Sequence, residues 1–260
     1  MGRITVITSG KGGVGKTTAT ANLGVALSKL NQKVALVDMD MGLRNLDVIL
    51  GLENRIVYDL VDVAEGICPL SRALIRDHQH PGLTLLPASR ARGQEAVNVR
   101  QMRELTEQLA RIHDHVLVDC PAGIEIGFNN ALAGAHGAVI VTVPEVSAVR
   151  DAQRVAGLLR DQQIDAKLLI NRVRPAMVRR GDMMDIDEVV DILKLPILGI
   201  VPEDNRVVRH NNFGIPIADG KGKAAESYCR IARRLKGEAI PIVNPTQSHG
   251  LALFWSALGG

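Results

Sequence analysis

One glycine-rich run in this 260-residue chain combines the residue types that hold phosphate. It reads Gly10-Lys11-Gly12-Gly13-Val14-Gly15-Lys16-Thr17, which fits the pattern G-x-x-x-x-G-K-[ST] and adds a second lysine, Lys11. Glycines allow successive backbone N–H groups to turn toward one point, where they form a cradle for anionic oxygens. Lys16 is then predicted to reach the β- and γ-phosphates, and the Thr17 hydroxyl to ligate Mg²⁺. We therefore predict that residues 10–17 and the adjoining Thr18 bind a nucleotide.

Carboxylates at two predicted strand ends supply groups for hydrolysis. Asp38 and Asp40 close an apolar run, and backbone alternation puts both on one side of an extended chain. Facing a phosphate loop, such a pair can orient Mg²⁺-bound water and an attacking water. Asp119 closes the apolar run 115–118, which is the Walker B pattern and predicts support for Mg²⁺. Phosphoryl transfer needs mainly positioning and charge neutralisation, so these carboxylates and the two lysines form a sufficient set.

Short β-branched apolar runs alternate with longer helix-like segments along the whole chain. This alternation is typical of a mostly parallel sheet covered by helices on both faces, so the predicted fold class is α/β, a single-domain P-loop NTPase. Loops at the carboxyl ends of the strands are expected to carry the functional residues. The predicted strands are 3–8, 33–38, 83–87, 115–119, 138–143, 166–171 and 197–202, and the predicted helices are 16–30, 100–113, 147–162, 187–193 and 222–236.

Composition excludes several other classes of protein. A hydrophobic content of 46% suits one large α/β core, and a net charge of +3 is too small to predict nucleic-acid binding. The three cysteines form no C-x-x-C pair, which favours a reduced cytosolic protein over a structural zinc or disulfide protein. The first strand begins at the N-terminus, where a signal peptide would stand, and no apolar run approaches the roughly 20 residues that span a bilayer. We therefore expect a soluble or peripheral protein.

The loop with its early lysine, taken with the carboxylate segments, resembles the deviant Walker A ATPases of the MinD/ParA group. The resemblance implies that Lys11 reaches across a dimer interface to the partner's nucleotide, so that a homodimer forms around two ATP molecules. It also implies that Asp40 positions or deprotonates the attacking water while Asp38 holds the water shell of the metal. Pro121-Ala122-Gly123 resembles switch II, in which the Gly123 N–H would sense the γ-phosphate.

The same resemblance implies where the base would bind. Asn171-Arg172 and Pro202-Glu203-Asp204 each follow a predicted strand, at positions where this group holds adenine. The sequence lacks Asn-Lys-x-Asp, the usual guanine-reading pattern of GTPases. ATP with Mg²⁺ is therefore favoured over GTP, and ATP hydrolysis is the expected reaction.

Segments outside the nucleotide motifs resemble the MinD branch of the group over roughly residues 2–236. They are Gly42-Leu43-Arg44-Asn45-Leu46-Asp47, Val57-Tyr58-Asp59-Leu60, Leu86-Pro87-Ala88-Ser89, Pro121-Ala122-Gly123-Ile124-Glu125, Pro144-Glu145-Val146-Ser147-Ala148-Val149-Arg150-Asp151 and Arg180-Gly181-Asp182-Met183. The resemblance implies a switch that positions the division septum, located in the cytoplasm and peripherally on the inner face of the cell membrane, or in the plastid stroma. Implied partners are a MinC-like division inhibitor and a MinE-like stimulator of hydrolysis, with docking expected at Arg44, Arg150 and Asp151.

The C-terminus differs in composition from the ATPase domain predicted for residues 1–236. Residues 237–248 contain two prolines and predict an extended linker. In the tail 249–260, the large apolar residues Leu251, Phe254, Trp255 and Leu258 share one face of a helix. Burying them would contribute on the order of 6–12 kcal/mol gross, much of it offset by ordering about ten residues at ~1–2 kcal/mol each.

One such tail is therefore a marginal membrane anchor, and two tails on an ATP-bound dimer would bind far better. No Lys or Arg follows Lys236, so the hydrophobic contribution must dominate over attraction to anionic lipid. The alternative is a tail that folds back onto its own domain.

Two rival functions share this fold. A ParA-type DNA-segregation ATPase has the same loop, and a basic cluster would bind DNA with steep salt dependence; it comprises Arg172, Arg174, Arg179 and Arg180. The tail and the MinD-like segments favour a membrane switch without a specific nucleic-acid partner. An iron–sulfur carrier needs cysteines paired across a dimer, and Cys68, Cys120 and Cys229 do not fit that pattern.

Overall fold

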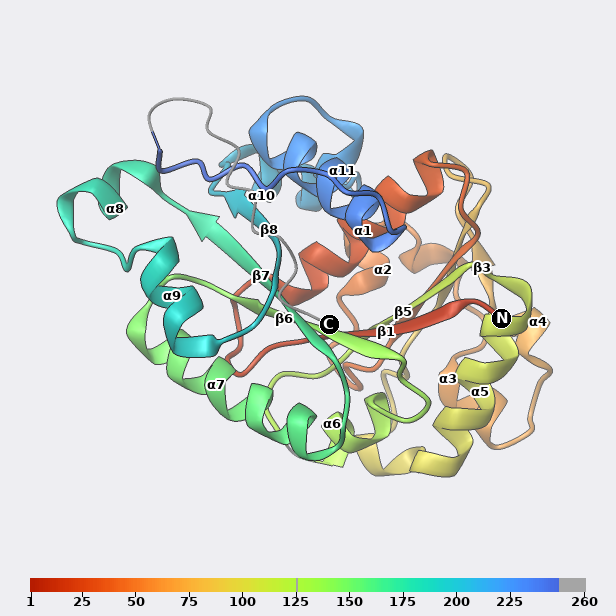
Figure 1. Cartoon of the computed structure of the whole chain (residues 1–260). Coiled ribbons are helices and arrows are strands. Elements are labelled where there is room, and N and C mark those ends of the chain that lie inside the picture. The colour runs from red at the N-terminus through yellow and green to blue at the C-terminus, as the bar shows by residue number, and fades with distance from the viewer. Residues whose placement is uncertain (125, 248–260) are drawn as a thin grey trace.

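A single twisted sheet crosses the centre of the molecule, as the computed structural model shows for residues 1–124 and 126–247 (Figure 1). These described residues form eight strands in the order β3-β4-β2-β5-β1-β6-β7-β8. Only β3 runs antiparallel to its neighbour. The strands are β1 (Arg3–Thr8), β2 (Val34–Asp38), β3 (Ile75–Arg76), β4 (Leu83–Leu86), β5 (His115–Asp119), β6 (Gly137–Thr142), β7 (Ala166–Val173) and β8 (Ile197–Pro202).

Helices cover both faces of the sheet and make a three-layer structure. In Figure 1, α1 and α11 lie on the upper face while α5 and α7 lie on the lower face. The helices are α1 (Lys16–Lys29), α2 (Leu46–Ile49), α3 (Leu60–Ala64), α4 (Leu70–Ala73), α5 (Val99–Ile112), α6 (Ile126–Ala131), α7 (Val146–Asp161), α8 (Pro175–Arg180), α9 (Ile186–Leu193), α10 (Arg206–Asn212) and α11 (Lys223–Leu235), with 3₁₀ turns η1 (Glu53–Arg55), η2 (Gln94–Ala96) and η3 (Ile217–Asp219).

Strand alternation divides the core into two hydrophobic clusters, one on each face. In β1, Ile4 and Val6 pack into the cluster that contains α5 and α7, whereas Ile7 packs into the cluster that contains α1 and α11. All residues of β2 and β5 are buried, because helices cover both faces of these central strands. Parallel pairing then aligns the strand ends and places Asp38 directly beside Asp119.

The structure confirms the predicted α/β class, and each predicted strand and helix corresponds to an observed one with ends shifted by at most two residues. The prediction missed the two-residue β3 and the short helices α2, α3, α4, α6, α8 and α10. Elements of two to seven residues are too short to show a clear hydrophobic period. Over the described part of the chain, none of the helices has the length and apolarity required to cross a bilayer.

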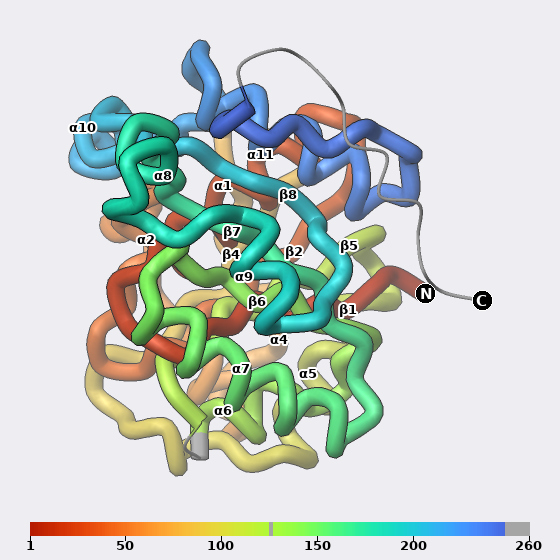
Figure 2. The backbone as a smooth tube through the Cα atoms, turned by 60° about the vertical axis from the view of Figure 1, so that its left-hand side comes forward, coloured from red at the N-terminus to blue at the C-terminus, as the bar shows by residue number. Residues whose placement is uncertain are grey.

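Residues 238–247, which we call the strap, run along the surface after α11 (dark blue in Figures 1 and 2). The Arg234 guanidinium donates from Nε to the Ile240 carbonyl at 2.8 Å and from Nη1 to the Leu198 carbonyl of β8 at 2.9 Å. Ile242 packs against the core and Asn244 is buried. These contacts hold the strap against the domain. The predicted tail residues Leu251, Phe254, Trp255 and Leu258 lie outside the described residues.

Candidate nucleotide-binding and hydrolysis site

The glycine-rich loop joins β1 to α1 and leaves open space beside its central glycines. Gly13 and Gly15 have φ angles of 79° and 90°, in the left-handed region that glycine adopts without strain. A Cβ added at Gly12 or Gly13 would meet nothing within 4 Å, so space for a ligand exists there. A Cβ at Gly10 would instead overlap the backbone of Asp151 in α7, so the base of the loop is packed against that helix.

The loop lysine Lys16 is paired with the strand-end carboxylate of Asp119. Lys16 Nζ lies 3.1 Å from Asp119 Oδ1, and both side chains are buried. Thr20, one turn along α1, donates its hydroxyl to the same oxygen at 2.9 Å. Burial alone would lower the pKa of Lys16, but the Asp119 charge and hydrogen bond raise it. Lys16 is therefore a firmly charged group at the wall of the cradle.

The two carboxylates after β2 occupy different environments. Asp38 is fully buried, and its carboxylate accepts backbone N–H groups from Asp40 at 2.9 Å and Leu46 at 3.3 Å. Burial, reinforced by the adjacent Asp119 charge, raises the pKa of Asp38 to about 8. Asp40 is half-buried, and burial also raises its pKa, although the Lys16 charge acts in the opposite direction. Asp38 thus organises the backbone of the segment after β2, while Asp40 remains partly exposed.

The donor set at these strand ends fits Mg²⁺. Asp119 Oδ2 is buried and has no hydrogen-bond partner, and such an atom commonly marks the place of an ion or water. The Thr17 hydroxyl and the carboxylates of Asp38 and Asp119 are hard oxygen ligands of the kind that Mg²⁺ prefers, directly or through water. The single charge of Lys16 offsets only one of the two adjacent buried carboxylates, and Mg²⁺ would offset the remaining charge.

The predicted base-binding residues are brought together beside the loop. Asn171 donates from Nδ2 to the Val14 carbonyl at 2.9 Å, and Arg172 donates from Nη1 to the Gly13 carbonyl at 3.3 Å. Arg172 and Arg174 both pair with Glu203, and their hydrogen bonds lower the pKa of Glu203 against the effect of its partial burial.

The segment after β8 continues this wall. Pro202 closes β8 and is buried. Asp204 pairs with Arg206, and that hydrogen bond lowers the pKa of Asp204. Asn171, Arg172 and residues 202–204 therefore border the loop where a base attached to a bound phosphate chain could lie.

Lys11 does not point into its own cradle. Its Nζ donates to the Ser147 hydroxyl at 3.0 Å and lies 3.8 Å from the Glu145 carboxylate, at the start of α7. Its side chain is 43% exposed, so it is accessible to a second molecule.

The remaining predicted residues differ in exposure. Gly123 has a φ of 95°, and a Cβ there would meet nothing within 4 Å, so its surroundings are open. Arg150 is exposed on α7, and Asp151 is partly buried. Arg44, predicted to face a partner, is instead buried and pairs with Asp47 at 2.8 Å. In this conformation Arg44 holds the loop after β2 and presents no free charge.

Sequence reasoning missed three polar residues of this site. Thr20 follows Lys16 at i+4, so helical spacing could have placed both on the face toward Asp119. Asn211 of α10 donates from Nδ2 to the Thr18 hydroxyl at 3.2 Å. Its Oδ1 is buried without a partner, and nothing in the local sequence indicates this contact. Ser147, quoted only within a longer segment, is the hydrogen-bond partner of Lys11.

Comparison with known proteins identifies relatives over most of the chain. The CobQ/CobB/MinD/ParA nucleotide binding domain matches residues 5–217. The septum site-determining protein MinD of Bacillus subtilis is 51% identical over 246 residues, which are 93% of this chain and 92% of that protein. Its counterpart from Synechocystis is 48% identical over 97% of this chain and 96% of that protein.

Solved structures agree with this relationship. A chain of the MinC:MinD cell division protein complex of Aquifex aeolicus superposes with a TM-score of 0.88 at 48% identity, covering 93% of this chain and 98% of that chain. The septum site-determining protein of Pyrococcus horikoshii, solved with Mg-ADP, superposes with a TM-score of 0.82 at 31% identity, covering 90% of this chain and 96% of that chain.

Proposed function

Because the chain belongs to the MinD branch of the CobQ/CobB/MinD/ParA nucleotide-binding family, we propose that it is a membrane-cycling ATPase of cell division. In this proposal the chain dimerises around ATP, binds the membrane through residues 249–260 and recruits a MinC-like inhibitor that restricts septum formation to one place. A MinE-like partner would stimulate hydrolysis and release. The observation that carries the proposal is the open glycine cradle with Lys16, Asp40 and Asp119 at its wall and Lys11 outside it.

Nucleotide binding would begin with an exchange of partners by Lys16. In the free chain its ammonium group pairs with Asp119. A phosphate oxygen entering the cradle is a competing anion, and the backbone N–H groups of the loop provide the remaining donors. Mg²⁺, when bound, would neutralise phosphate charge and screen Asp38 and Asp119 from each other.

Asp40 is the residue best placed to act on the attacking water. Burial raises the pKa of Asp40, so its carboxylate binds a proton more strongly than an exposed carboxylate does. This suits a general base, because the pKa of an effective general base lies near the working pH. Asp38 is fully buried and bound by two backbone N–H groups, which suits a positioning role. Asp40 would accept a proton from the attacking water or orient the lone pair of that water.

Lys11 supports the dimer part of the proposal. The Ser147 hydroxyl and the half-exposed Glu145 carboxylate are partners that a triphosphate can displace, because charge-assisted bonds to phosphate are stronger. Reaching a partner's nucleotide would therefore need only a side-chain movement of Lys11.

The basic cluster offers little support for the rival DNA-binding function. Arg172 and Arg174 share Glu203, and Arg180 pairs with Asp182 at 2.8 Å. Pairing neutralises much of the charge that a phosphate backbone would need.

Vesicle co-sedimentation tests the proposal. The intact chain and the full-length variant Phe254→Glu would each be mixed with vesicles and ATP, ADP or no nucleotide. ATP-dependent pelleting that Phe254→Glu abolishes is the expected result. Equal pelleting in all nucleotide states would contradict the proposed link between hydrolysis and release from the membrane. ATP-dependent binding to DNA without binding to vesicles would instead support a DNA-segregation ATPase.

A further inference from the structure

A groove of about 760 Å³ opens beside the nucleotide loop and is distinct from the phosphate cradle. It lies between the start of α7, α8 and the start of α9. Its apolar lining includes three methionines, Met177, Met183 and Met184, together with Val146 and Val178. Methionine is flexible and polarizable, and it is common at surfaces that accept apolar segments. The volume is within the range of sites that enclose a bulky ligand.

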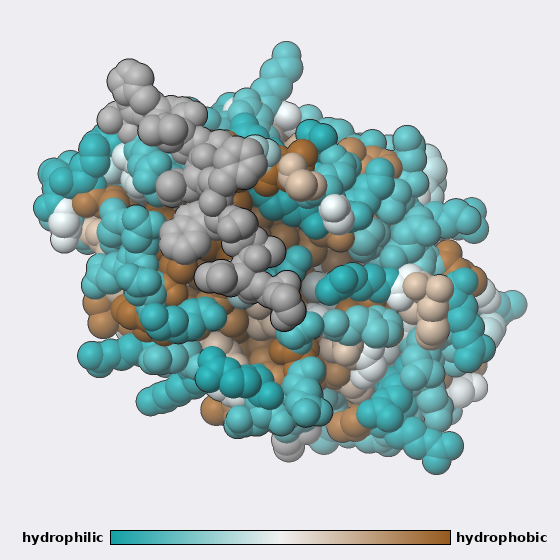
Figure 3. All heavy atoms as spheres, viewed as in Figure 1, coloured by the Kyte–Doolittle hydropathy of each residue, from teal (hydrophilic) through white to brown (hydrophobic). Residues whose placement is uncertain are grey.

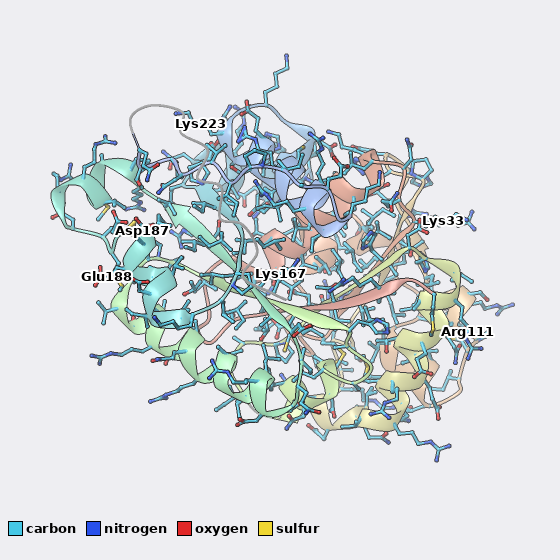
Figure 4. The ribbon with its side chains drawn as sticks, viewed as in Figure 1. Lys33, Arg111, Lys167, Asp187, Glu188 and Lys223 are labelled. Carbon is cyan, nitrogen blue, oxygen red and sulfur yellow. The ribbon has the colours of Figure 1, made fainter. Side chains whose placement is uncertain are left out.

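The rim of this groove is mostly acidic. Five carboxylates and two arginines line it, namely Glu145, Asp182, Asp185, Glu188, Glu203, Arg172 and Arg174. Figure 4 shows Glu188 on α9, on the same side of the molecule as α8. An acidic rim disfavours anionic lipid headgroups and acidic peptides. It tolerates an uncharged apolar segment, which pays no electrostatic penalty there.

Residues 248–260 are an uncharged apolar segment of this kind, and the strap that precedes them leads toward the side of the molecule that carries α8. Residues 248–260 contain no Asp, Glu, Lys or Arg. Arg234, Ile242 and Asn244 hold the strap on the domain. Figures 1 and 2 both place its far end on the side that carries α8. Thirteen further residues can extend at most about 3.3–3.6 Å each, which is ample to reach across a small helix. Figure 3 shows apolar surface around α9, which forms one wall of the groove.

We propose that this methionine-lined groove holds the apolar tail of the same chain when no ATP is bound, and releases it when ATP binds. The inference rests on the proposed membrane function of the tail. Two lining residues connect the groove to the nucleotide: Arg172 donates to the Gly13 carbonyl of the loop, and Glu145 lies beside Lys11. When phosphate occupies the loop and Lys11 turns to a partner, both of these contacts change, and with them one wall of the groove.

Trp255 is the only tryptophan of the chain and reports directly on its own surroundings. Its emission and its quenching by acrylamide would be measured in the full chain without vesicles. We expect a shielded tryptophan without nucleotide or with ADP, and a shift to longer wavelength with a non-hydrolysable ATP analogue. The shielding should persist on hundredfold dilution, because the contact is within one chain. Loss of shielding on dilution would overturn the proposal by assigning the groove to a second copy.

Groove variants locate the contact. Met177→Glu should expose Trp255 without nucleotide, and Met183→Gln should do so partially if Met177→Glu fails to fold. The matched control is Ile112→Glu, at an exposed position of α5 far from the groove, which should leave the emission unchanged. If the tail is docked about nine-tenths of the time, Met177→Glu should raise nucleotide-free vesicle binding about tenfold.

The two proposals fail in different ways. A fully exposed Trp255 in the nucleotide-free chain would overturn tail docking while leaving ATP-dependent vesicle binding intact. Shielding that Met177→Glu does not change would place the tail elsewhere and overturn this groove. Shielding with ATP-dependent release, but without vesicle binding, would support the groove and contradict the membrane function.

Discussion

At the scale of single residues, the candidate site combines two fully buried carboxylates with one that is half-buried. Asp38 and Asp119 are completely buried, whereas Asp40 is only half-buried. For Asp40→Asn we expect hydrolysis to fall about 100- to 10,000-fold, because the amide cannot accept a proton from water. Nucleotide affinity should change little, since among the described residues the Asp40 carboxylate forms no hydrogen bond or ion pair with the loop. Phosphate release and equilibrium binding of labelled ATP would check this; unchanged hydrolysis would remove Asp40 from the mechanism.

Thr20 provides a second prediction at this scale. Thr20→Val removes the hydroxyl that donates to Asp119 and leaves a buried carboxylate oxygen with one partner fewer. We expect the free energy of unfolding to fall by about 1–3 kcal/mol. Thr142→Val is the matched control, because Thr142 is equally buried but makes only a 3.4 Å hydrogen bond to the Val143 carbonyl. Urea denaturation would measure the free energy of unfolding of both variants. Equal decreases in the two variants would show that the hydrogen bond to Asp119 contributes no more than the one to Val143.

At the scale of elements, two glycines of the loop are expected to affect different properties, Gly10 the packing of the loop against α7 and Gly12 the binding of ligand. Gly10→Ala should destabilise the fold by about 1–3 kcal/mol, because its Cβ would overlap the α7 backbone. Gly12→Ala places a methyl group in open space, so stability should be kept while ATP affinity falls. Thermal unfolding and nucleotide titration of the two variants would test this contrast. Similar destabilisation in both would contradict the open cradle.

A buried histidine joins three elements at the opposite end of the sheet. His80, in the β3–β4 turn, contacts Asp219 of η3 at 3.0 Å and Asp77 at 3.4 Å, and Lys29 of α1 bonds the adjacent Ala218 carbonyl. The hydrogen bond to Asp219, together with the nearby Asp77 carboxylate, raises the pKa of His80 to about 9.

A raised histidine pKa stabilises the folded state below the unfolded pKa of about 6.5, and this stabilisation disappears as the pH rises through about 9. We expect His80→Gln to lose on the order of 2–3 kcal/mol of unfolding free energy at pH 6 and much less at pH 10. Denaturation of both proteins at the two pH values would test this, with His78→Gln, at the neighbouring exposed position, as the control. A pH-independent difference would show that the histidine is not charged in the folded state.

The elements that sequence predicted well are those with a strong periodic pattern. β1, β5 and β8 begin and end at the predicted residues, because continuous β-branched runs are bounded by turn residues. The phosphate loop and Asp119 could be located because glycine spacing and a strand-terminal aspartate are local features. The burial of Arg44 and the contact of Asn211 with Thr18 arise from residues far apart in the chain, so no local pattern encodes them.

At the scale of the whole molecule, Lys11 links the proposed dimer to the nucleotide. For Lys11→Ala we expect ATP binding by single chains to persist while ATP-dependent dimerisation is lost, since the loop keeps Lys16 and its backbone donors. Lys33→Ala is the control, because Lys33 lies at the right of Figure 4, opposite the side that carries α8 and α9. Light scattering with a non-hydrolysable ATP analogue would distinguish the two; a normal dimer with Lys11→Ala would assign the lysine a role within one chain.

Both borders of the sheet are poor templates for another strand. At one border β3 is only two residues long, and at the other Arg234 already occupies the Leu198 carbonyl of β8 while the strap lies alongside. Short or covered edges of this kind prevent pairing between sheets of different molecules. A lipid surface would confine many copies to two dimensions and raise their local concentration greatly. In the proposed membrane cycle, crowded copies would therefore not join edge to edge through their sheets, so the same molecules could detach and be used again.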